Sequence, residues 1–255
     1  MLGLGNSIVT SAFSQEGFEL TSINGLQLWL KNKEGVTDNG TLTWADSSGN
    51  SNDATQSTVN SKPDYDSEDG SFDFAGSTGS NPIHLDLADD ISLGAFTAFF
   101  AIDMVFPTPG TSDFYILTDV ALGTNKLIQM FKSSQDTTSV FGYVLGGTAG
   151  APSGTGARGF STPPVANTKF VLVITKSAAS GATIKFFKNS TEMVSTTLFS
   201  SSNTVDIEII GSSQQGGRSH SGKIYEIAIY DSLLSSDNIT SVLNNIGERN
   251  SIDVQ

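Results

Sequence analysis

The chain has 255 residues, 26 acidic and 13 basic side chains, a formal net charge of −13 and no cysteine. This acidity argues against partners with phosphate backbones or anionic membranes, since like charges repel, and the absence of cysteine excludes disulfides and thiolate metal sites. The length suits one all-β domain with a substantial core.

The first 24 residues form a segment with scattered apolar side chains, and the first basic residue of the chain is Lys31. A secretory signal needs a basic start and an unbroken apolar core, so we expect a chain made in the cytoplasm that keeps this segment, although Thr10–Ala12 resembles a cleavage site. No stretch reaches the roughly 20 apolar residues of a membrane span.

The N-terminal segment is either a terminus or extra strand on its own domain, or an arm that docks on a neighbouring subunit. The docking residues would be Leu2, Leu4, Ile8, Val9 and Phe13. We therefore divide the chain into an anchoring arm, 1–24, and one domain, 25–255.

Alternating apolar and polar residues predict a first strand at Leu26–Leu30, and Asp38-Asn39-Gly40 predicts a tight turn before Leu42 and Trp44. The segment 46–66 is rich in Ser, Asn and Asp, whose side chains bond to the local main chain, so we expect an ordered surface connection. Further strands are predicted at 72–74, 83–87, 96–106, 115–118, 126–132, 140–145, 170–175, 183–187, 193–198 and 205–210. About a dozen strands fit two antiparallel sheets of about six. The Gly-, Ser- and Pro-rich segment 146–164 is the loop that we expect to face a partner.

The stretch 222–235 predicts a central strand, because both of its faces are largely apolar. Ile224, Glu226, Ala228 and Tyr230 alternate with Tyr225, Ile227 and Ile229. A helix should follow directly, capped by Ser235 or Ser236, with Asp237 in its first turn and Ile239, Val242, Leu243 and Ile246 at helical spacing until Gly247. The predicted fold is all-β, a two-sheet antiparallel jelly-roll sandwich closed by a short C-terminal helix.

The order and spacing of seven sequence fragments carry a family resemblance. The fragments are Leu26–Leu30, Trp44–Ala54, Phe72–Gly76, Phe96–Phe106, Lys169–Lys176, Phe186–Asn189 and Gly222–Ser235. Together they resemble the laminin-G-like domains of the concanavalin A-like lectin/glucanase superfamily. The resemblance covers most of the chain and implies the concanavalin A-like jelly roll. Because the superfamily includes enzymes, lectins and structural modules, it leaves the function open.

Enzymes of this superfamily that cut β-glucans carry Glu-x-Asp-x-x-Glu on one strand, and this motif does not occur in the sequence. The nearest groups are Asp64, Asp66, Glu68 and Asp69, expected in a loop, and Asp206 with Glu208, expected on the solvent face of a strand whose other face is Val205, Ile207 and Ile209. The two histidines, His84 and His220, are expected at the surface. Retaining hydrolysis needs two carboxyls about 5 Å apart, so we expect no enzymatic activity.

Calcium is the one cofactor that the resemblance suggests, because relatives often bind it. Asp46 and Asp53 are the candidate ligands, but their spacing, with Asn50 between them, misses the EF-hand pattern. The alternative is that these side chains cap the loop main chain, and we favour it. The predicted cofactor is therefore none, with calcium left open.

A sugar site needs an exposed aromatic ring beside polar groups. Trp29, Trp44, Tyr115 and Tyr143 are the candidates. Trp29 and Trp44 lie in fragments that form the core in the family, so burial is expected for both. Tyr143, next to the Gly-rich loop that holds Arg158, is the aromatic that we propose as exposed, with Arg158 as its polar neighbour.

The Met1–Ser7 opening and the overall size resemble virion proteins of tailed phages, in particular those that infect marine cyanobacteria. The first functional hypothesis is therefore a non-enzymatic virion protein, a capsid decoration or a tail- or fibre-associated protein, present in many copies or as a homo-oligomer. It would bind other virion proteins through residues 1–24 and help attachment to the host surface. The alternative is a lectin-like module for a host or environmental glycan, with calcium dependence left open, in a secreted or cell-surface setting. Neither hypothesis involves nucleic acid or a membrane span.

Overall fold

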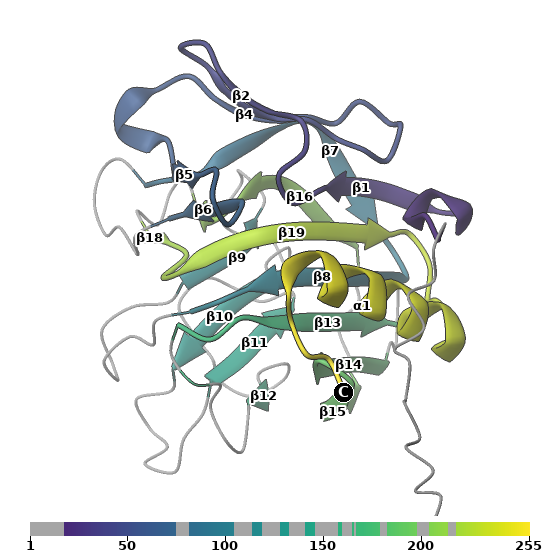
Figure 1. Ribbon diagram of the computed structural model, residues 1–255. Helices are drawn as coiled ribbons and strands as arrows, with labels where there is room; N and C mark the ends of the chain where they lie inside the picture. The colour runs from purple at the N-terminus through teal and green to yellow at the C-terminus, as the bar shows by residue number, and fades with distance from the viewer. Residues whose placement is uncertain are drawn as a thin grey trace, which may run out of the picture.

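The computed structural model describes residues 18–74, 82–104, 114–118, 128–132, 141–145, 158–159, 165, 167–178, 183–197, 204–213 and 218–255. Figure 1 shows strands stacked around the long strand β19 (Lys223–Tyr230), with α1 (Ser236–Asn250), the single α-helix of the described residues, packed in front of them. The strands form two antiparallel sheets, so the predicted sandwich with a C-terminal helix is confirmed. No helix among the described residues is long and apolar enough to cross a membrane.

The first sheet contains eight strands in the described residues. In spatial order they are β15 (Thr191–Thr197), β14 (Thr183–Lys188), β13 (Phe170–Lys176), β8 (Phe96–Ile102), β19, β6 (Ser71–Asp73) and β5 (Asp64–Asp66), with β1 (Leu26–Leu30) also paired to β19. Asp64 and Asp66, predicted to lie in a loop, are in the edge strand β5, and both are exposed. Edge strands commonly carry charges, which discourage pairing with other chains.

The second sheet contains nine strands in the described residues. Their order is β12 (Arg158–Gly159), β11 (Phe141–Leu145), β10 (Ile128–Lys132), β9 (Phe114–Thr118), β16 (Val205–Ile210), β7 (Leu85–Leu93), β4 (Ala54–Gln56), β3 (Leu42–Trp44) and β2 (Val36–Asp38). Strands β17 (Ser212–Ser213) and β18 (Arg218–Ser219) form a separate pair, and two short 3-10 helices are η1 (Leu20–Ser22) and η2 (Val59–Ser61). The sheets are larger than predicted because short strands such as β4 and β5 lie in the segment expected to be a loop.

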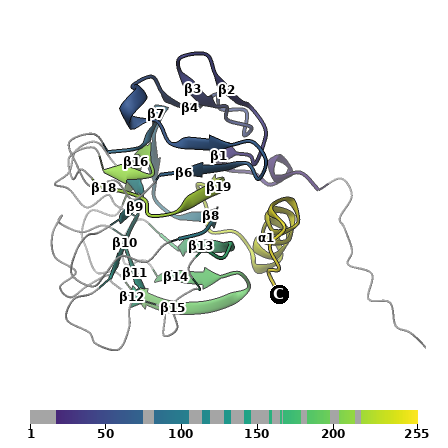
Figure 2. The same ribbon diagram turned by 60° about the vertical axis from the view of Figure 1, so that its left-hand side comes forward.

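Two apolar clusters hold these layers together. The inner core lies between the sheets and includes Trp44, Phe72 and Phe100. The outer cluster lies between the eight-stranded sheet and α1 and includes Trp29, Phe99 and Val242. Figure 2 shows α1 on the side of that sheet turned away from the nine-stranded sheet. The central strands β8 and β13 are buried on both faces, as expected of strands covered on both sides.

The predicted alternation of β19 is wrong at its start. A β-bulge between Ile224 and Glu226 interrupts the pairing with β8, and a bulge changes which face the following residues occupy. Ile224 therefore joins Ile227 and Ile229 in the inner core, while Tyr225 lies in the outer cluster. Because of the bulge, the consecutive residues Tyr225 and Glu226 both lie on the side of the sheet that faces α1.

The helix begins as predicted but ends later. The Ser235 side chain accepts a hydrogen bond from the Asn238 backbone N–H, and Ser251 ends the helix in the left-handed conformation at φ 56°. Gly247 lies inside the helix, where a Cβ would be 2.7 Å from Val254 Cγ1. Gly247 therefore permits close packing of the C-terminal residues and is not the stop signal that the sequence suggested.

Residues 18–24, the described part of the predicted arm, pack against their own domain. Leu20 is fully buried in the outer cluster. The Tyr230 hydroxyl donates to the Leu20 carbonyl over 3.1 Å, and the Asn245 side chain donates to the Phe18 carbonyl over 3.2 Å. Residues 18–24 therefore pack as part of the sandwich of their own chain. The five predicted docking residues, Leu2, Leu4, Ile8, Val9 and Phe13, lie outside the described residues.

Candidate functional site

The loop proposed for calcium covers the open edge of strand β1. The Asp46 carboxylate accepts hydrogen bonds from the backbone N–H groups of Trp29, Ser48 and Asn52 at 2.8–3.1 Å. The Asn50 side chain donates to the Leu26 carbonyl over 2.9 Å. Polar side chains thus pair with main-chain groups that a neighbouring strand would otherwise take.

Asp53 has a similar structural contact, because its carboxylate accepts the Asp46 backbone N–H over 2.8 Å. These bonds are the capping contacts that we favoured for the loop. Within the described residues there is no group of three or more His, Asp or Glu side chains arranged to hold a metal ion. Calcium at Asp46 and Asp53 stays a prediction.

Replacing Asp46 with alanine is expected to lower the free energy of unfolding by about 1–3 kcal/mol, the usual effect of leaving partly buried donors unpaired. Urea unfolding of Asp46→Ala measures this. The control is Asp66→Ala, which removes a bond to the Glu68 N–H in an exposed turn and should cost much less. Equal losses in the two variants would contradict the capping role. A melting temperature that calcium raises in the wild type only would instead support the metal site.

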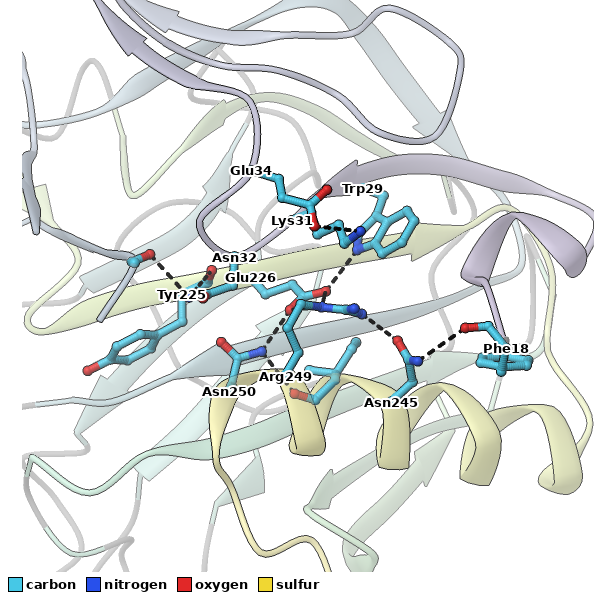
Figure 3. A network of polar contacts seen from close by, with 12 residues as sticks. Phe18, Trp29, Lys31, Asn32, Glu34, Tyr225, Glu226, Asn245, Arg249 and Asn250 are labelled. Carbon is cyan, nitrogen blue, oxygen red and sulfur yellow. Dashed lines mark hydrogen bonds and ion pairs between the residues drawn. The ribbon is translucent and has the colours of Figure 1, made fainter. Parts of the chain in front are cut away.

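A buried carboxylate fastens the helix to the sheet. Glu226 on β19 has no exposed surface, and Figure 3 shows it between Trp29 of β1 and the helix residues Arg249 and Asn250. Its oxygens accept the Trp29 indole N–H over 2.8 Å, the Arg249 Nε–H over 3.0 and 3.1 Å, and the Asn250 amide over 2.7 Å. Arg249 also donates to Asn245. The one acidic residue in an otherwise apolar strand was the sequence signal for this network, but its partners come from distant segments.

A second buried cluster surrounds Asp103, just after β8. Its carboxylate accepts the Tyr225 hydroxyl over 2.9 Å and the Lys223 backbone N–H over 2.8 Å. Burial, followed by the hydrogen bond to Asp103, raises the pKa of Tyr225. The Lys169 ammonium lies 4.1 Å from the centre of the Tyr225 ring. Since Tyr225 is only 2% exposed, it is not available as a platform for a ligand.

The expectation that both histidines lie at the surface is wrong. His220 has no exposed surface and His84 is 7% exposed. His220 Nε2 donates to the Asp103 carbonyl over 3.1 Å, which assigns the proton to Nε2, and among the described residues Nδ1 has no hydrogen-bond partner. Burial lowers the pKa of His220 to about 4. The loop context of His220 gave no indication that it would pack against Phe74 and the Asp103 main chain.

His84 differs from His220 because it has acidic and carbonyl partners. Its Nδ1 donates to the Pro82 carbonyl over 2.8 Å, and its Nε2 lies 3.4 Å from the Asp86 carboxylate. Burial acts to lower the pKa of His84, but the contacts with Asp86 and Pro82 outweigh it, so the pKa is raised. A histidine in this setting holds Asp86, at the start of β7, in place. None of these contacts is with a nucleophile.

The solvent face predicted for the acids of β16 is only partly open. Asp206 and Glu208 are both half-buried. A bulge between Ile207 and Ile209 interrupts the pairing with β7, and Ile210 joins Ile207 in the inner core while Ile209 does not. The bulge therefore places Ile209 on the side of the sheet away from the inner core. The sequence had predicted Asp206 and Glu208 on that side.

The two residues predicted to bind sugar, Tyr143 and Arg158, are register partners on β11 and β12, at one edge of the nine-stranded sheet. The pairing pattern places them on the side of the sheet that also holds Ile128. Ile128 pairs with Leu117, and Leu117 pairs with Ile210 of the inner core. By this register the two positions belong to the core-facing side of the sheet, and their side chains lie outside the part that the structure describes. Sugar binding by this pair stays a prediction.

The opposite side, which we call the outer face of the nine-stranded sheet, is turned away from the eight-stranded sheet. Thr37, Thr43, Thr55 and Asp86 pair in succession across β2, β3, β4 and β7 on this face. The Asp86 side chain is 46% exposed, so the face is open to solvent there. Ile209 continues the row on β16 and has no exposed surface. This part of the open face therefore ends at β16.

No protein-family model matches the sequence, and no curated protein matches it in sequence. Solved structures do match in fold. The binding domain of botulinum neurotoxin DC in complex with SialylT has a TM-score of 0.60 at 14% identity, over 89% of this chain and 52% of that chain. A structure of botulinum neurotoxin type C, whose cell entry depends on two ganglioside molecules, has a TM-score of 0.59 at 14% identity with the same coverage. This chain thus spans about half the length of these toxin domains.

A further match covers almost a whole protein domain. Domain 4 of AbnA, a GH43 extracellular arabinanase from Geobacillus stearothermophilus, was solved in complex with arabinotriose; its TM-score is 0.51 at 14% identity, over 86% of this chain and 98% of that chain. At such identities the likeness shows the fold alone, a β-sandwich, which agrees with the fold implied by the family resemblance.

Proposed function

We propose that this chain is a non-catalytic module that binds neutral glycans. The observation that carries the proposal is the match to an arabinanase domain of nearly the same extent, which holds arabinotriose. The toxin binding domains support glycan binding in general, but not the preference for neutral glycans, since one is in complex with SialylT and another belongs to a toxin that depends on gangliosides. These neighbours favour the lectin hypothesis over the virion role.

The net charge of −13 is the reason why we expect neutral glycans to bind better than anionic ones. An acidic protein repels anionic ligands, so sialylated, sulfated and uronic acid-rich sugars are disfavoured relative to neutral ones. The chain should therefore differ in specificity from a module that recognises sialic acid. A neutral oligosaccharide presents an apolar ring face and hydroxyl groups, and it binds with little dependence on salt.

The absence of catalysis is part of the proposal. Hydrolysis of a glycosidic bond needs an accessible carboxyl pair. The most buried carboxylates described above, Glu226 and Asp103, are both occupied by internal hydrogen bonds. These groups fix the helix and the end of β8, and neither lies where a sugar would reach it, since Glu226 is fully buried and Asp103 is 6% exposed.

Affinity electrophoresis tests the function. Migration of the whole chain should be slowed by at least one neutral polysaccharide among arabinan, xylan and mixed-linkage β-glucan, and titration calorimetry with the matching oligosaccharide should give a binding isotherm. Sialyllactose serves as the anionic control and should give none. Unchanged migration in all the neutral gels would overturn the proposal, and release of reducing ends would overturn its non-catalytic part.

A further inference from the structure

The turn between β2 and β3 holds one of the two Asn-Gly pairs of the chain. Asn39 and Gly40 are both exposed, and the Gly40 main chain has a positive φ of 93°. A Cβ built on Gly40 would have no heavy atom within 4 Å. The turn therefore has room for a ring to form between these two residues.

An asparagine followed by glycine loses ammonia without an enzyme. The backbone nitrogen of the glycine attacks Cγ of the asparagine, so that an N–Cγ bond forms, the Cγ–Nδ2 bond breaks, and ammonia leaves behind a five-membered imide. Water then adds to one of the two imide carbonyls and opens the ring to aspartate or isoaspartate. Glycine suits the second position because it puts no side chain in the path of attack. The glycine nitrogen must also lose its proton, which a positioned base can accept.

Asp38 lies where this proton has to go. Its Oδ1 accepts a hydrogen bond from the Gly40 backbone N–H over 3.1 Å, within the reach that a general base requires. The Lys62 ammonium lies 2.8 Å from the same oxygen and lowers the pKa of Asp38. The carboxylate is therefore ionised at neutral pH and able to accept the proton.

The second Asn-Gly pair is held in place by its neighbours. Asn24 is exposed, but the Gly25 carbonyl accepts the Asp231 backbone N–H over 2.9 Å. A Cβ on Gly25 would collide with Asp231 Oδ1, so this carboxylate lies against the Gly25 main chain. Leu26, the next residue, is buried and pairs with Tyr230. Ring closure requires the peptide between Asn24 and Gly25 to turn, and these contacts oppose that movement.

We propose that Asn39 is a self-modification site, converted to aspartate and isoaspartate by attack of the Gly40 nitrogen, with Asp38 as the proton acceptor. Water is the co-reactant and ammonia the leaving group. Isoaspartate lengthens the main chain of the turn by one carbon, and the turn sets the register of a hairpin. Either product adds a negative charge beside the pair of Asp38 and Lys62. The proposal does not depend on glycan binding.

The test follows the full chain at neutral pH by mass spectrometry of its proteolytic peptides, with isoaspartate methyltransferase and labelled S-adenosylmethionine as the probe for isoaspartate. Asn39 should convert at least about tenfold faster than Asn24, a modest share of the effect of a positioned general base. In urea, which removes the tertiary contacts, the two pairs should convert at similar rates.

Asp38→Asn keeps the shape of the side chain and removes the base, so it should slow the conversion of Asn39 by at least about tenfold. The matched control is Asp66→Asn, since Asp66 accepts the Glu68 N–H over 2.9 Å in another exposed turn. This variant should convert Asn39 at the wild-type rate. Thermal melts accompany the variants, and Asp38→Ser, which also lacks the carboxylate, replaces Asp38→Asn if that protein does not melt cooperatively.

Two results would overturn the proposal. If Asn39 stays intact in the folded chain and converts only in urea, the turn protects the residue and the site is wrong. If Asn39 reacts as fast without the Asp38 carboxylate as with it, or no faster than Asn24, the local sequence alone sets the rate and Asp38 has no part in it.

Discussion

Replacing Glu226 with glutamine is expected to lower the free energy of unfolding by about 3–5 kcal/mol, the usual effect of breaking a buried ion pair from one side. Every neighbour of the Glu226 carboxylate is a donor: the Trp29 indole, the Arg249 guanidinium and the Asn250 amide. A glutamine amide group would point N–H groups at other N–H groups in either orientation. The Arg249 charge would also lose its counter-ion.

The matched control is Glu192→Gln, which makes the same chemical change in an exposed pair. Glu192 binds Lys185 over 3.0 Å, and the two side chains are 40% and 43% exposed. Such surface pairs contribute at most about 1 kcal/mol. Urea unfolding followed by tryptophan fluorescence measures both variants, and the Glu226 variant should melt on the order of 10 °C lower. Similar stability in the two variants would mean that α1 is held by apolar contacts alone.

Acidification from pH 6.5 to pH 4 is expected to remove roughly 3 kcal/mol of stability through His220 alone. Burial holds the pKa of His220 at about 4 in the folded protein, against 6.5 ordinarily. Between these values the unfolded chain binds a proton that the folded chain does not, and each pH unit is worth about 1.4 kcal/mol. The stability is therefore complete above pH 6.5, falls as the pH drops toward 4, and loses nothing further from this group below that.

The Asp103 and Asp73 carboxylates near His220 act to raise its pKa but are outweighed by burial. Comparing the pH dependence of unfolding in wild type and His220→Gln separates this histidine from the carboxylates, because the variant should lose the slope between pH 6.5 and 4. His84→Gln is the control. Contacts with Asp86 and Pro82 raise the pKa of His84, so its contribution is complete below pH 6.5 and is lost as the pH rises above that value. A His220 variant with an unchanged slope would assign the acid sensitivity to the carboxylates.

Much of the fold follows from local pattern. The strand at Leu26–Leu30 and the Asp38-Asn39-Gly40 turn lie where predicted, and the Gly40 N–H bonds back to the Asp38 carboxylate. The predicted alternation within that strand is wrong at its start, because a bulge puts Leu26 in the outer cluster while Leu28 and Leu30 lie in the inner core. The Ser235 cap and the buried face of α1 are as predicted. Both tryptophans are buried, Trp29 at 3% and Trp44 at 0% exposure, as the family fragments implied. These features depend on a few neighbouring residues, which is why a sequence pattern identifies them.

The errors occur where the alternation is broken by one residue. Bulges in β1, β16 and β19 move Leu26, Ile209 and Tyr225 to the opposite side of their sheets. A bulge leaves no consistent signature in composition. The same holds for the candidate site. The local sequence does not distinguish Tyr143 from Tyr115, but the register across the three strands β9, β10 and β11 gives the two positions opposite faces. Only pairing with distant strands distinguishes a core position from one on the outer face.

The sequence by itself determined the fold class, the C-terminal helix and the acidic, cysteine-free character that favours a neutral ligand, because each of these depends on composition or on residues close together in the chain. The tertiary structure alone decided the partners of Glu226, the burial of His220, the use of Asp46 to cover the edge of β1, and which residues share the outer face. The physical reason is that hydrogen-bond partners and strand register join segments far apart in the chain: Trp29 and Glu226 lie 197 residues apart and meet at 2.8 Å.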